Sequence, residues 1–231
     1  MSLYSVRDLR KTYRVGDVET HALNGVDLDI EDGEFTAIAG PSGSGKSTLL
    51  HLMGALDRPD GGEVQLAGQR IDRLGRQEAA RMRLARLGFV FQAYNLIPVL
   101  SAIENAAFVL ELRGVGRVER ERKAREALAA LGMEGFEDRM PNQLSGGQQQ
   151  RVAVARAIAA DPDIVLADEP TANLDSATGQ QLIDLMRSLN QERGVTFVFS
   201  THDPRLLEHV SRIVHLEDGR VLREEGGPAA A

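Results

Sequence analysis

The sequence of 231 residues contains no cysteine and no uninterrupted apolar run of about 18 residues or more. The first absence excludes disulfides and thiolate metal sites, and it permits a reducing compartment without proving one. The second predicts that the chain does not insert into a membrane by itself, so any membrane role needs a partner. The first ten residues, MSLYSVRDLR, also lack the apolar core of a signal peptide. The formal net charge of -7 argues against a broad nucleic-acid surface, and no nucleic-acid partner is expected.

The length fits one well-buried α/β domain, which we expect over residues 1–225. Alternating apolar residues, clearest at Val26, Leu28 and Ile30, predict half-buried antiparallel strands near the start. The stretch FTAIAG is nearly continuous in apolar residues and predicts a strand buried on both faces, as parallel sheets require. The end of the chain, EEGGPAAA, predicts disorder, and we take residues 226–231 as a disordered tail.

The middle of the chain, roughly residues 93–160, predicts a mostly helical subdomain. It includes a capping pattern at Ser101 and Glu104 that predicts a helix start. After it, the apolar runs DIVLAD, VTFVFS and RIVHL alternate with helical segments, one of them from Ser176 to about Arg193. This order predicts an α/β fold with a mainly parallel sheet, an N-terminal antiparallel β subdomain and a helical subdomain.

Residues 40–48, GPSGSGKST, lie between the predicted buried strand and a helical pattern. They match GxxxxGK[ST], a loop whose backbone amides approach phosphate oxygens closely. Lys46 would lie against the β and γ phosphates of a nucleotide, and Ser47 would offer its hydroxyl to Mg²⁺. The alternative, a glycine-rich turn with an incidental lysine, does not account for the strand before it and the helix after it. The loop therefore predicts a P-loop NTPase core that binds the phosphates of a nucleotide together with Mg²⁺.

Two adjacent carboxylates, Asp168 and Glu169, end the apolar stretch IVLADEP. Side chains alternate at the end of a strand, so the two groups have different surroundings. We assign Asp168 to the metal and Glu169 to the attacking water as general base. The alternative is an acidic pair that ends a strand and caps the next turn.

A second anion site is predicted in QLSGGQQQRVAVARA, residues 143–157, where a Ser and two glycines run into a helical pattern. The free N–H groups at such a helix start attract anions. One small domain seldom needs two phosphate sites, so this second site requires a separate explanation.

The loop at Gly40, LSGGQ from Leu144 and LADEP together resemble the ATP-binding cassette family, and the resemblance covers nearly the whole chain. In that family two cassettes meet head to tail, and each LSGGQ turn closes on the ATP held by the other chain. The resemblance therefore implies that Ser145, Gly146, Gly147 and Gln148 contact the nucleotide of a second copy. An ordinary Ser-capped helix would explain Ser145 but not the double glycine.

The resemblance also implies roles for single residues. Tyr13 is similar to the aromatic that stacks on adenine, although a tyrosine at this place is more often part of a core. Gln92 resembles the glutamine that senses Mg²⁺ and water, and otherwise would be a surface residue. The NLD segment ending at Asp175 resembles the loop that communicates across the dimer, whereas by itself Asp175 or Ser176 would be a helix cap. His202 resembles the histidine that touches the γ-phosphate, and alone it would be a structural residue.

The candidate site residues fall into three overlapping groups. The nucleotide-binding group is Tyr13, Gly40, Pro41, Ser42, Gly43, Ser44, Gly45, Lys46, Ser47, Thr48, Ser145, Gly146, Gly147 and Gln148. The catalytic group is Lys46, Gln92, Glu169 and His202, and the metal group is Ser47, Gln92 and Asp168.

Within the family, FVFQAYNLIPVLSAIEN and GPSGSGKSTLLHLMGALDRP are similar to cassettes of the macrolide-exporter and lipoprotein-release type. This implies an ATPase subunit, peripheral on the cytoplasmic face of the inner membrane, that forms a homodimer and drives a separate transmembrane permease. Ala93 to Pro98 follow Gln92, where the family receives the permease's coupling helix. Leu96 and Ile97 suit such an apolar contact.

Three other functions can be set against this interpretation of the sequence. DNA-repair and chromosome-organising ATPases carry a long coiled coil between the phosphate loop and LSGGQ, and residues 48–143 have no sustained heptads. Translation cassettes usually come in tandem, whereas this sequence has one GxxxxGK[ST]. A cassette that acts through a membrane partner on cell-wall enzymes, moving no substrate, uses the same ATP cycle, and the sequence leaves that alternative open.

Overall fold

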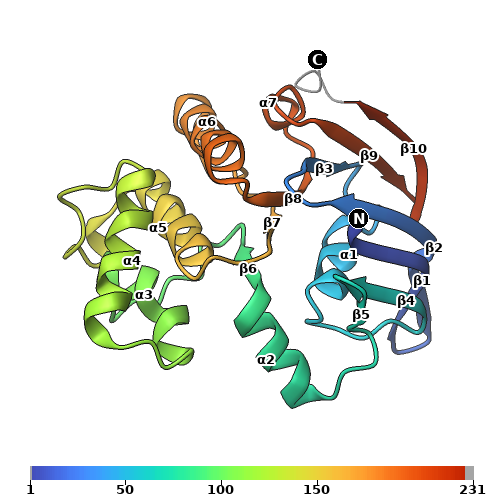
Figure 1. The fold of residues 1–231 in the computed structure, drawn as a ribbon. Helices are drawn as coiled ribbons and strands as arrows, with labels where there is room; N and C mark the ends of the chain where they lie inside the picture. The colour runs from blue at the N-terminus through green and yellow to red at the C-terminus, as the bar shows by residue number, and fades with distance from the viewer. Residues whose placement is uncertain (1, 227–231) are drawn as a thin grey trace. The chain divides into compact units, whose positions relative to one another are not determined.

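The computed structural model describes residues 2–226, which fall into two compact units. The first unit takes its residues from 1–83 and 196–231, and the second consists of residues 84–195 (Figure 1). Because the chain enters the first unit, leaves it and returns, residues from both ends of the sequence build one core.

The N-terminal part of the first unit is an antiparallel sheet with the strand order β2-β1-β4-β5. Its strands are β1 (Ser2–Val15), β2 (Val18–Glu31), β4 (Gly61–Leu66) and β5 (Gln69–Arg70). Strands β1 and β2 pair from Ser2 opposite Glu31 to Val15 opposite Val18. The alternating residues Val26, Leu28 and Ile30 are all buried. The antiparallel β subdomain predicted from this alternation is therefore confirmed.

The other strands of this unit form a sheet in which β3 (Phe35–Ala39) has a neighbour on each side, and the five residues of β3 are all buried. Strand β3 pairs in parallel with β8 (Thr196–Thr201) and β9 (Arg212–Glu217), and β10 (Arg220–Gly226) adds an antiparallel edge to β9. Helices α1 (Lys46–Met53) and α7 (Pro204–Leu207) belong to the same unit, and the first stretch of chain in this unit ends within α2 (Arg76–Arg86). Phe35 packs edge-on against Phe197 and Phe199, with ring centroids 5.5 and 4.7 Å apart. This burial confirms the predicted parallel strand FTAIA.

Strand β10 corrects the prediction that EEGGPAAA is disordered. Its residues Glu224, Glu225 and Gly226 pair with β9. Glu224 forms an ion pair with Arg212 at 2.5 Å, and Glu225 is hydrogen bonded to His215 Nε2 at 2.7 Å. The polar composition suggested disorder because these partners lie about ten residues away and cannot be inferred from local pattern. Residues 227–231 of the predicted tail lie outside the described residues.

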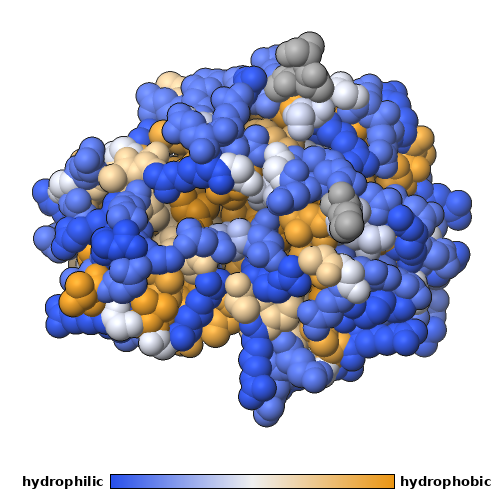
Figure 2. All heavy atoms as spheres, viewed as in Figure 1, coloured by the Kyte–Doolittle hydropathy of each residue, from blue (hydrophilic) through white to orange (hydrophobic). Residues whose placement is uncertain are grey.

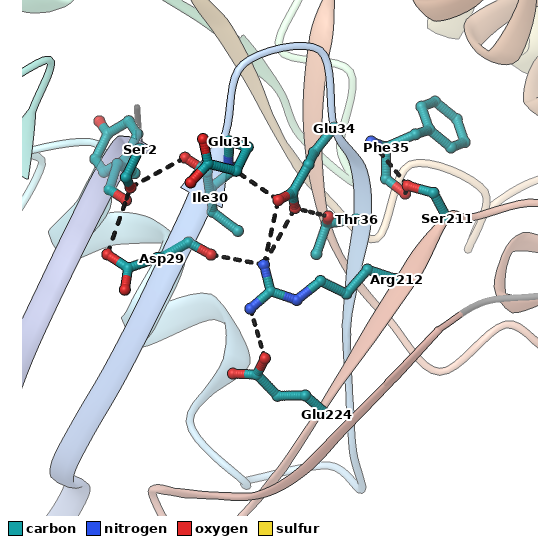
Figure 3. Close-up of polar contacts among 11 residues, drawn as sticks. Ser2, Asp29, Ile30, Glu31, Glu34, Phe35, Thr36, Ser211, Arg212 and Glu224 are labelled. Carbon is teal, nitrogen blue, oxygen red and sulfur yellow. Dashed lines mark hydrogen bonds and ion pairs between the residues drawn. The ribbon is translucent and has the colours of Figure 1, made fainter. Parts of the chain in front are cut away.

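Arg212 joins strands of both sheets in the first unit (Figure 3). One guanidinium nitrogen donates to the backbone carbonyl of Asp29 on β2 at 2.7 Å and lies 3.3 Å from the Glu34 carboxylate. The other nitrogen donates to Glu224 on β10 at 2.5 Å. Glu34 also accepts from Thr36 Oγ1 at 2.6 Å and from the backbone N–H of Glu31 at 3.0 Å. One half-buried cation therefore connects β2, β9, β10 and the turn before β3.

The second unit contains two parallel strands and most of the helices. The strands are β6 (Leu87–Val90) and β7 (Ile164–Asp168). The helices are α3 (Ala102–Leu112), α4 (Arg117–Ala130), the 3-10 turn η1 (Pro141–Gln143), α5 (Gly146–Ile158) and α6 (Ser176–Arg193). Ser101 and Glu104 form the expected capping box at the start of α3. Helices α3, α4 and α5 lie inside the segment predicted as helical, and α6 has its predicted ends.

On the face shown in Figure 2, apolar residues form separate small areas, and polar residues cover most of the surface between them. No helix within residues 2–226 is both long and apolar enough to cross a bilayer.

We expect Arg212→Met to lower the free energy of unfolding by about 2 kcal/mol, because Glu34 would keep its burial and lose its cation. Arg122→Met is the matched control, since Arg122 pairs with Glu119 and Glu126 on the exposed face of α4. Exposed pairs of this kind contribute little. Urea unfolding of both variants measures the difference, and equal unfolding midpoints would contradict a bridging role for Arg212.

Candidate nucleotide site

The predicted phosphate loop follows β3 and enters α1 directly. Gly45 lies at the N-cap of α1 with φ 104°, a left-handed conformation that strongly favours glycine. A Cβ on Gly45 would lie 2.4 Å from the carbonyl oxygen of Ala22, and one on Gly40 would lie 2.0 Å from that of Leu216. The loop therefore lies close to the backbones of β2 and β9. Packing is by itself a sufficient reason for glycine at positions 40 and 45.

The polar groups of this loop fit a phosphate ligand. Lys46 is buried, and its Nζ donates to the carbonyls of Gly40 and Pro41 at 2.8 and 2.9 Å. Ser44 Oγ is buried and has no hydrogen-bond partner within residues 2–226. An orphaned hydroxyl beside a lysine held by backbone carbonyls is costly unless a ligand satisfies it. Ser47 is exposed at the first turn of α1, where an anion-bound metal could reach its hydroxyl.

Tyr13 is attached to the phosphate loop rather than to the core. It is 37 % exposed, and its hydroxyl donates to Asp57 at 3.0 Å and hydrogen bonds with Thr48. Partial burial and the hydrogen bond to Asp57 raise the pKa of Tyr13, so the ring stays neutral. Lys11 Nζ lies 5.1 Å from the ring centroid, a cation–π distance. The structure therefore brings Tyr13 to Thr48, one of the predicted nucleotide residues.

His202 follows the last residue of β8 and is exposed, as a ligand-contacting side chain must be. It belongs to the first unit together with Tyr13 and residues 40–48. Gln92, the turn at 145–148, Asp168 and Glu169 belong to the second unit.

The acidic pair in the second unit has an unusual backbone. Asp168 ends β7, and Glu169 follows with φ 47°. Left-handed backbone at a non-glycine residue costs free energy and is concentrated at functional sites. Both residues are half-buried.

The LSGGQ turn forms a closed capping box. Ser145 Oγ accepts from the backbone N–H of Gln148 at 3.3 Å, and Gln148 Oε1 accepts from that of Ser145 at 2.9 Å. A Cβ on Gly147 would lie 2.2 Å from Thr178 Cγ2, and one on Gly146 would lie 2.9 Å from Tyr94 Oη. The cap thus accounts for Ser145 alone, and close packing against Tyr94 and Thr178 is a second reason for the two glycines, beside the predicted contact with a nucleotide.

Asp175 is the N-cap of α6. This agrees with the alternative interpretation of the NLD segment, in which Asp175 or Ser176 caps a helix. Asp175 accepts from the backbone N–H groups of Ala177 and Thr178 at 3.1 and 3.0 Å. Hydrogen bonds from the Thr178 side chain and backbone lower the pKa of Asp175. The cap orders the first turn of α6, which carries Thr178, the residue that lies next to Gly147.

Gln92 begins a segment held mainly through its backbone. Its side chain is exposed, and its carbonyl accepts from Asn173 Nδ2 at 2.9 Å. Tyr94 and Asn95 have φ 58° and 52°, and Arg156 of α5 donates to both of their carbonyls at 2.9 and 2.5 Å. Burial lowers the pKa of Arg156. The segment after Gln92 is thus bound to the helix that begins with LSGGQ.

Sequence reasoning missed the buried polar residues that fix these loops. Asn105 on α3 binds both the N–H and the C=O of Ile97, at 2.8 and 3.1 Å. Arg156 and Gln150 act similarly from α5. The signal was present, because Asn105 and Gln150 interrupt otherwise apolar helix faces, but their partners could not be inferred.

No group of three or more His, Asp or Glu side chains suited to a metal is found within residues 2–226.

Comparison with known proteins adds the family. A family model described as ABC transporter matches residues 23–172. The lipoprotein-releasing system ATP-binding protein LolD of Anaeromyxobacter dehalogenans is 47 % identical, over 94 % of this chain and 91 % of that protein. The macrolide export ATP-binding/permease protein MacB of Syntrophobacter fumaroxidans is 42 % identical over 98 % of this chain, which spans 32 % of that protein.

Solved structures agree with this assignment. The dimeric structure of the cassette MJ0796, a protein of Methanocaldococcus jannaschii, has a TM-score of 0.90 and 45 % identity, over 96 % of this chain and 98 % of that one. A dimeric post-hydrolysis state of the same cassette, bound to ADP and Pi, has a TM-score of 0.89. The predicted P-loop NTPase fold is confirmed.

We expect Gly147→Ala to lower the free energy of unfolding by about 1–3 kcal/mol, the usual cost of overpacking. Thr178→Ser in the same chain should restore most of this loss, because it removes the clashing Cγ2 and keeps the hydroxyl that bonds Asp175. Urea unfolding of the single and double variants is the measurement. A Gly147→Ala protein as stable as the original chain would disprove the packing argument.

Proposed function

Because this chain belongs to the ABC transporter family, we propose that it is the ATP-hydrolysing subunit of a transporter and drives a separate membrane permease. The phosphate loop is the observation that carries this proposal, since Lys46 and the orphaned Ser44 hydroxyl suit a polyphosphate. The names of LolD and MacB support a partner of the lipoprotein-release or macrolide-export type. The subunit would lie peripherally on the cytoplasmic face of the inner membrane.

ATP is bound by residues 40–48, with Tyr13 against the adenine. Lys46 leaves the loop carbonyls for the β and γ phosphates, and His202 contacts the γ-phosphate. Ser47, Gln92 and Asp168 are the residues that would hold Mg²⁺, which would offset negative charge on the phosphates. Glu169 accepts a proton from the water that attacks the γ-phosphorus.

Two copies of the chain close head to tail around two ATP molecules. Ser145, Gly146, Gly147 and Gln148 of one copy then face the γ-phosphate held by the other, at the N-terminus of α5. The dimeric MJ0796 cassette supports this arrangement. Closure supplies backbone N–H donors where charge develops in the transition state, and phosphate release reopens the dimer.

The segment from Ala93 to Pro98 receives the permease. Leu96 and Ile97 are half-buried in the free subunit, and Asn105 fixes the backbone of Ile97. Val99, one residue beyond this segment, is 74 % exposed and is the larger unpartnered apolar surface. We therefore extend the proposed contact to Val99.

We expect Glu169→Gln to bind ATP, to hydrolyse it about 10² to 10⁴ times more slowly, and to accumulate as a closed dimer. Glutamine keeps the shape of the side chain but cannot accept the proton, and it removes repulsion from the γ-phosphate. Ser145→Arg in the same chain should prevent the dimer while ATP still binds at the chain's own phosphate loop. Light scattering with MgATP and with MgADP separates monomer from dimer.

Two results would count against these roles. A Glu169→Gln protein that hydrolyses ATP at the original rate would exclude Glu169 as the base. A double variant that still dimerises with MgATP would show that the LSGGQ turn does not meet the second copy's nucleotide.

We expect Val99→Asp to leave the isolated subunit folded and able to bind ATP, and to abolish its co-purification with the permease. The carboxylate stays in water on the free subunit but would be buried without a partner in the complex. Val118→Asp is the matched control, because Val118 is 86 % exposed on α4 of the same unit. Complex formation that is equal for both variants would locate the permease contact elsewhere.

A further inference from the structure

Gln150 is a polar side chain of α5 that the proposed mechanism does not use. It is fully buried, with 0 % of its surface exposed. Its Nε2 donates to the carbonyl oxygen of Pro170 at 2.7 Å. Its Oε1 has no hydrogen-bond partner anywhere in residues 2–226. An amide that satisfies one group and leaves another unsatisfied reduces stability relative to an apolar side chain of the same length.

The accepting carbonyl belongs to the residue directly after Glu169. The backbone of Glu169 is left-handed, and the proline after it restricts that backbone further. Such a conformation persists only where the surroundings hold it. The hydrogen bonds that hold it include one from the backbone N–H of Ala172 to the Glu169 carbonyl at 3.2 Å and one from Gln150 to the Pro170 carbonyl.

We propose that Gln150 is a positioning residue for Glu169: its amide fixes the Glu169–Pro170 backbone to helix α5 and so orients the carboxylate. This inference rests on the proposed role of Glu169 as the base. Helix α5 begins with the LSGGQ turn, so Gln150 makes the orientation of Glu169 depend on where that turn lies. In the closed dimer the turn faces one ATP and Glu169 serves the other. The hydrogen bond from Gln150 to Pro170 therefore links, within one chain, the turn that faces one ATP to the base that serves the other.

Gln150→Met tests this role, because methionine keeps the length of the side chain and removes both amide groups. We expect kcat for ATP to fall at least tenfold, while KM and the affinity for a fluorescent ATP analogue stay within about threefold of the original. The urea unfolding midpoint should stay the same or rise, since an unsatisfied buried oxygen has been removed. Gln150→Leu serves in the same assays if the Met variant is not folded.

Gln181→Met is the control for loss of one glutamine hydrogen bond in the same unit. Gln181 is exposed on α6 and accepts from Arg151 at 2.8 Å. Its kcat should stay within about twofold of the original. An unchanged kcat in Gln150→Met overturns the proposal. So does a loss of kcat accompanied by a lower unfolding midpoint and weaker analogue binding, because that pattern belongs to a structural residue.

A double-mutant cycle separates this inference from the proposed function. In a Glu169→Gln chain, adding Gln150→Met should cause no further loss in single-turnover hydrolysis, because the positioned group is already gone. A further tenfold loss on that background would show that Gln150 acts elsewhere and would overturn the inference while leaving Glu169 as the base. Original activity in Glu169→Gln alone would instead overturn the proposed base.

Discussion

The close approach of strands β2 and β9 to the phosphate loop is the constraint on which the first unit depends. The loop passes so near the carbonyls of Ala22 and Leu216 that a methyl group at Gly45 or Gly40 would overlap them. Ala22 lies on β2 and Leu216 on β9, so the loop keeps its shape only while those strands keep their distance. Arg212, on β9, binds the Asp29 carbonyl on β2 and the Glu224 carboxylate on β10, and it links the same two strands at a point further along them. The shape of the phosphate loop therefore depends on the packing of the strands beside it.

In the second unit, polar side chains of helix α5 hold the loops in place. Loops after β6 and β7 carry non-glycine residues in left-handed backbone, at Tyr94, Asn95 and Glu169. Arg156 and Gln150 hold these loops, and both side chains come from α5. Helix α5 is thus the common support of the segment after Gln92, of the LSGGQ turn and of the acidic pair. Few apolar contacts could give such directional control.

Local patterns in the sequence predicted the elements whose causes are local. The capping box at Ser101 and the ends of α6 follow from short-range hydrogen bonds, and the strand FTAIA follows from continuous apolar character. Strand β10 could not be predicted, because its polar residues are ordered by partners on β9. The same limit applied to the candidate site. Lys46 and Glu169 were identified from motif spacing, whereas Gln150 and Arg156 owe their importance to contacts about twenty and sixty residues away in sequence.

The closed capping box at LSGGQ means that the turn has an internal competitor for any anion. The Gln148 N–H that faces a phosphate in the proposed dimer already binds the hydroxyl of Ser145. Such a cap contributes about 0.5–2 kcal/mol, and an incoming phosphate oxygen must replace it. If the turn meets ATP as proposed, its net affinity is lower by that amount than the affinity of a bare helix start. In the proposed dimer such a turn would release the nucleotide readily, which favours opening after every turnover over a dimer that stays locked.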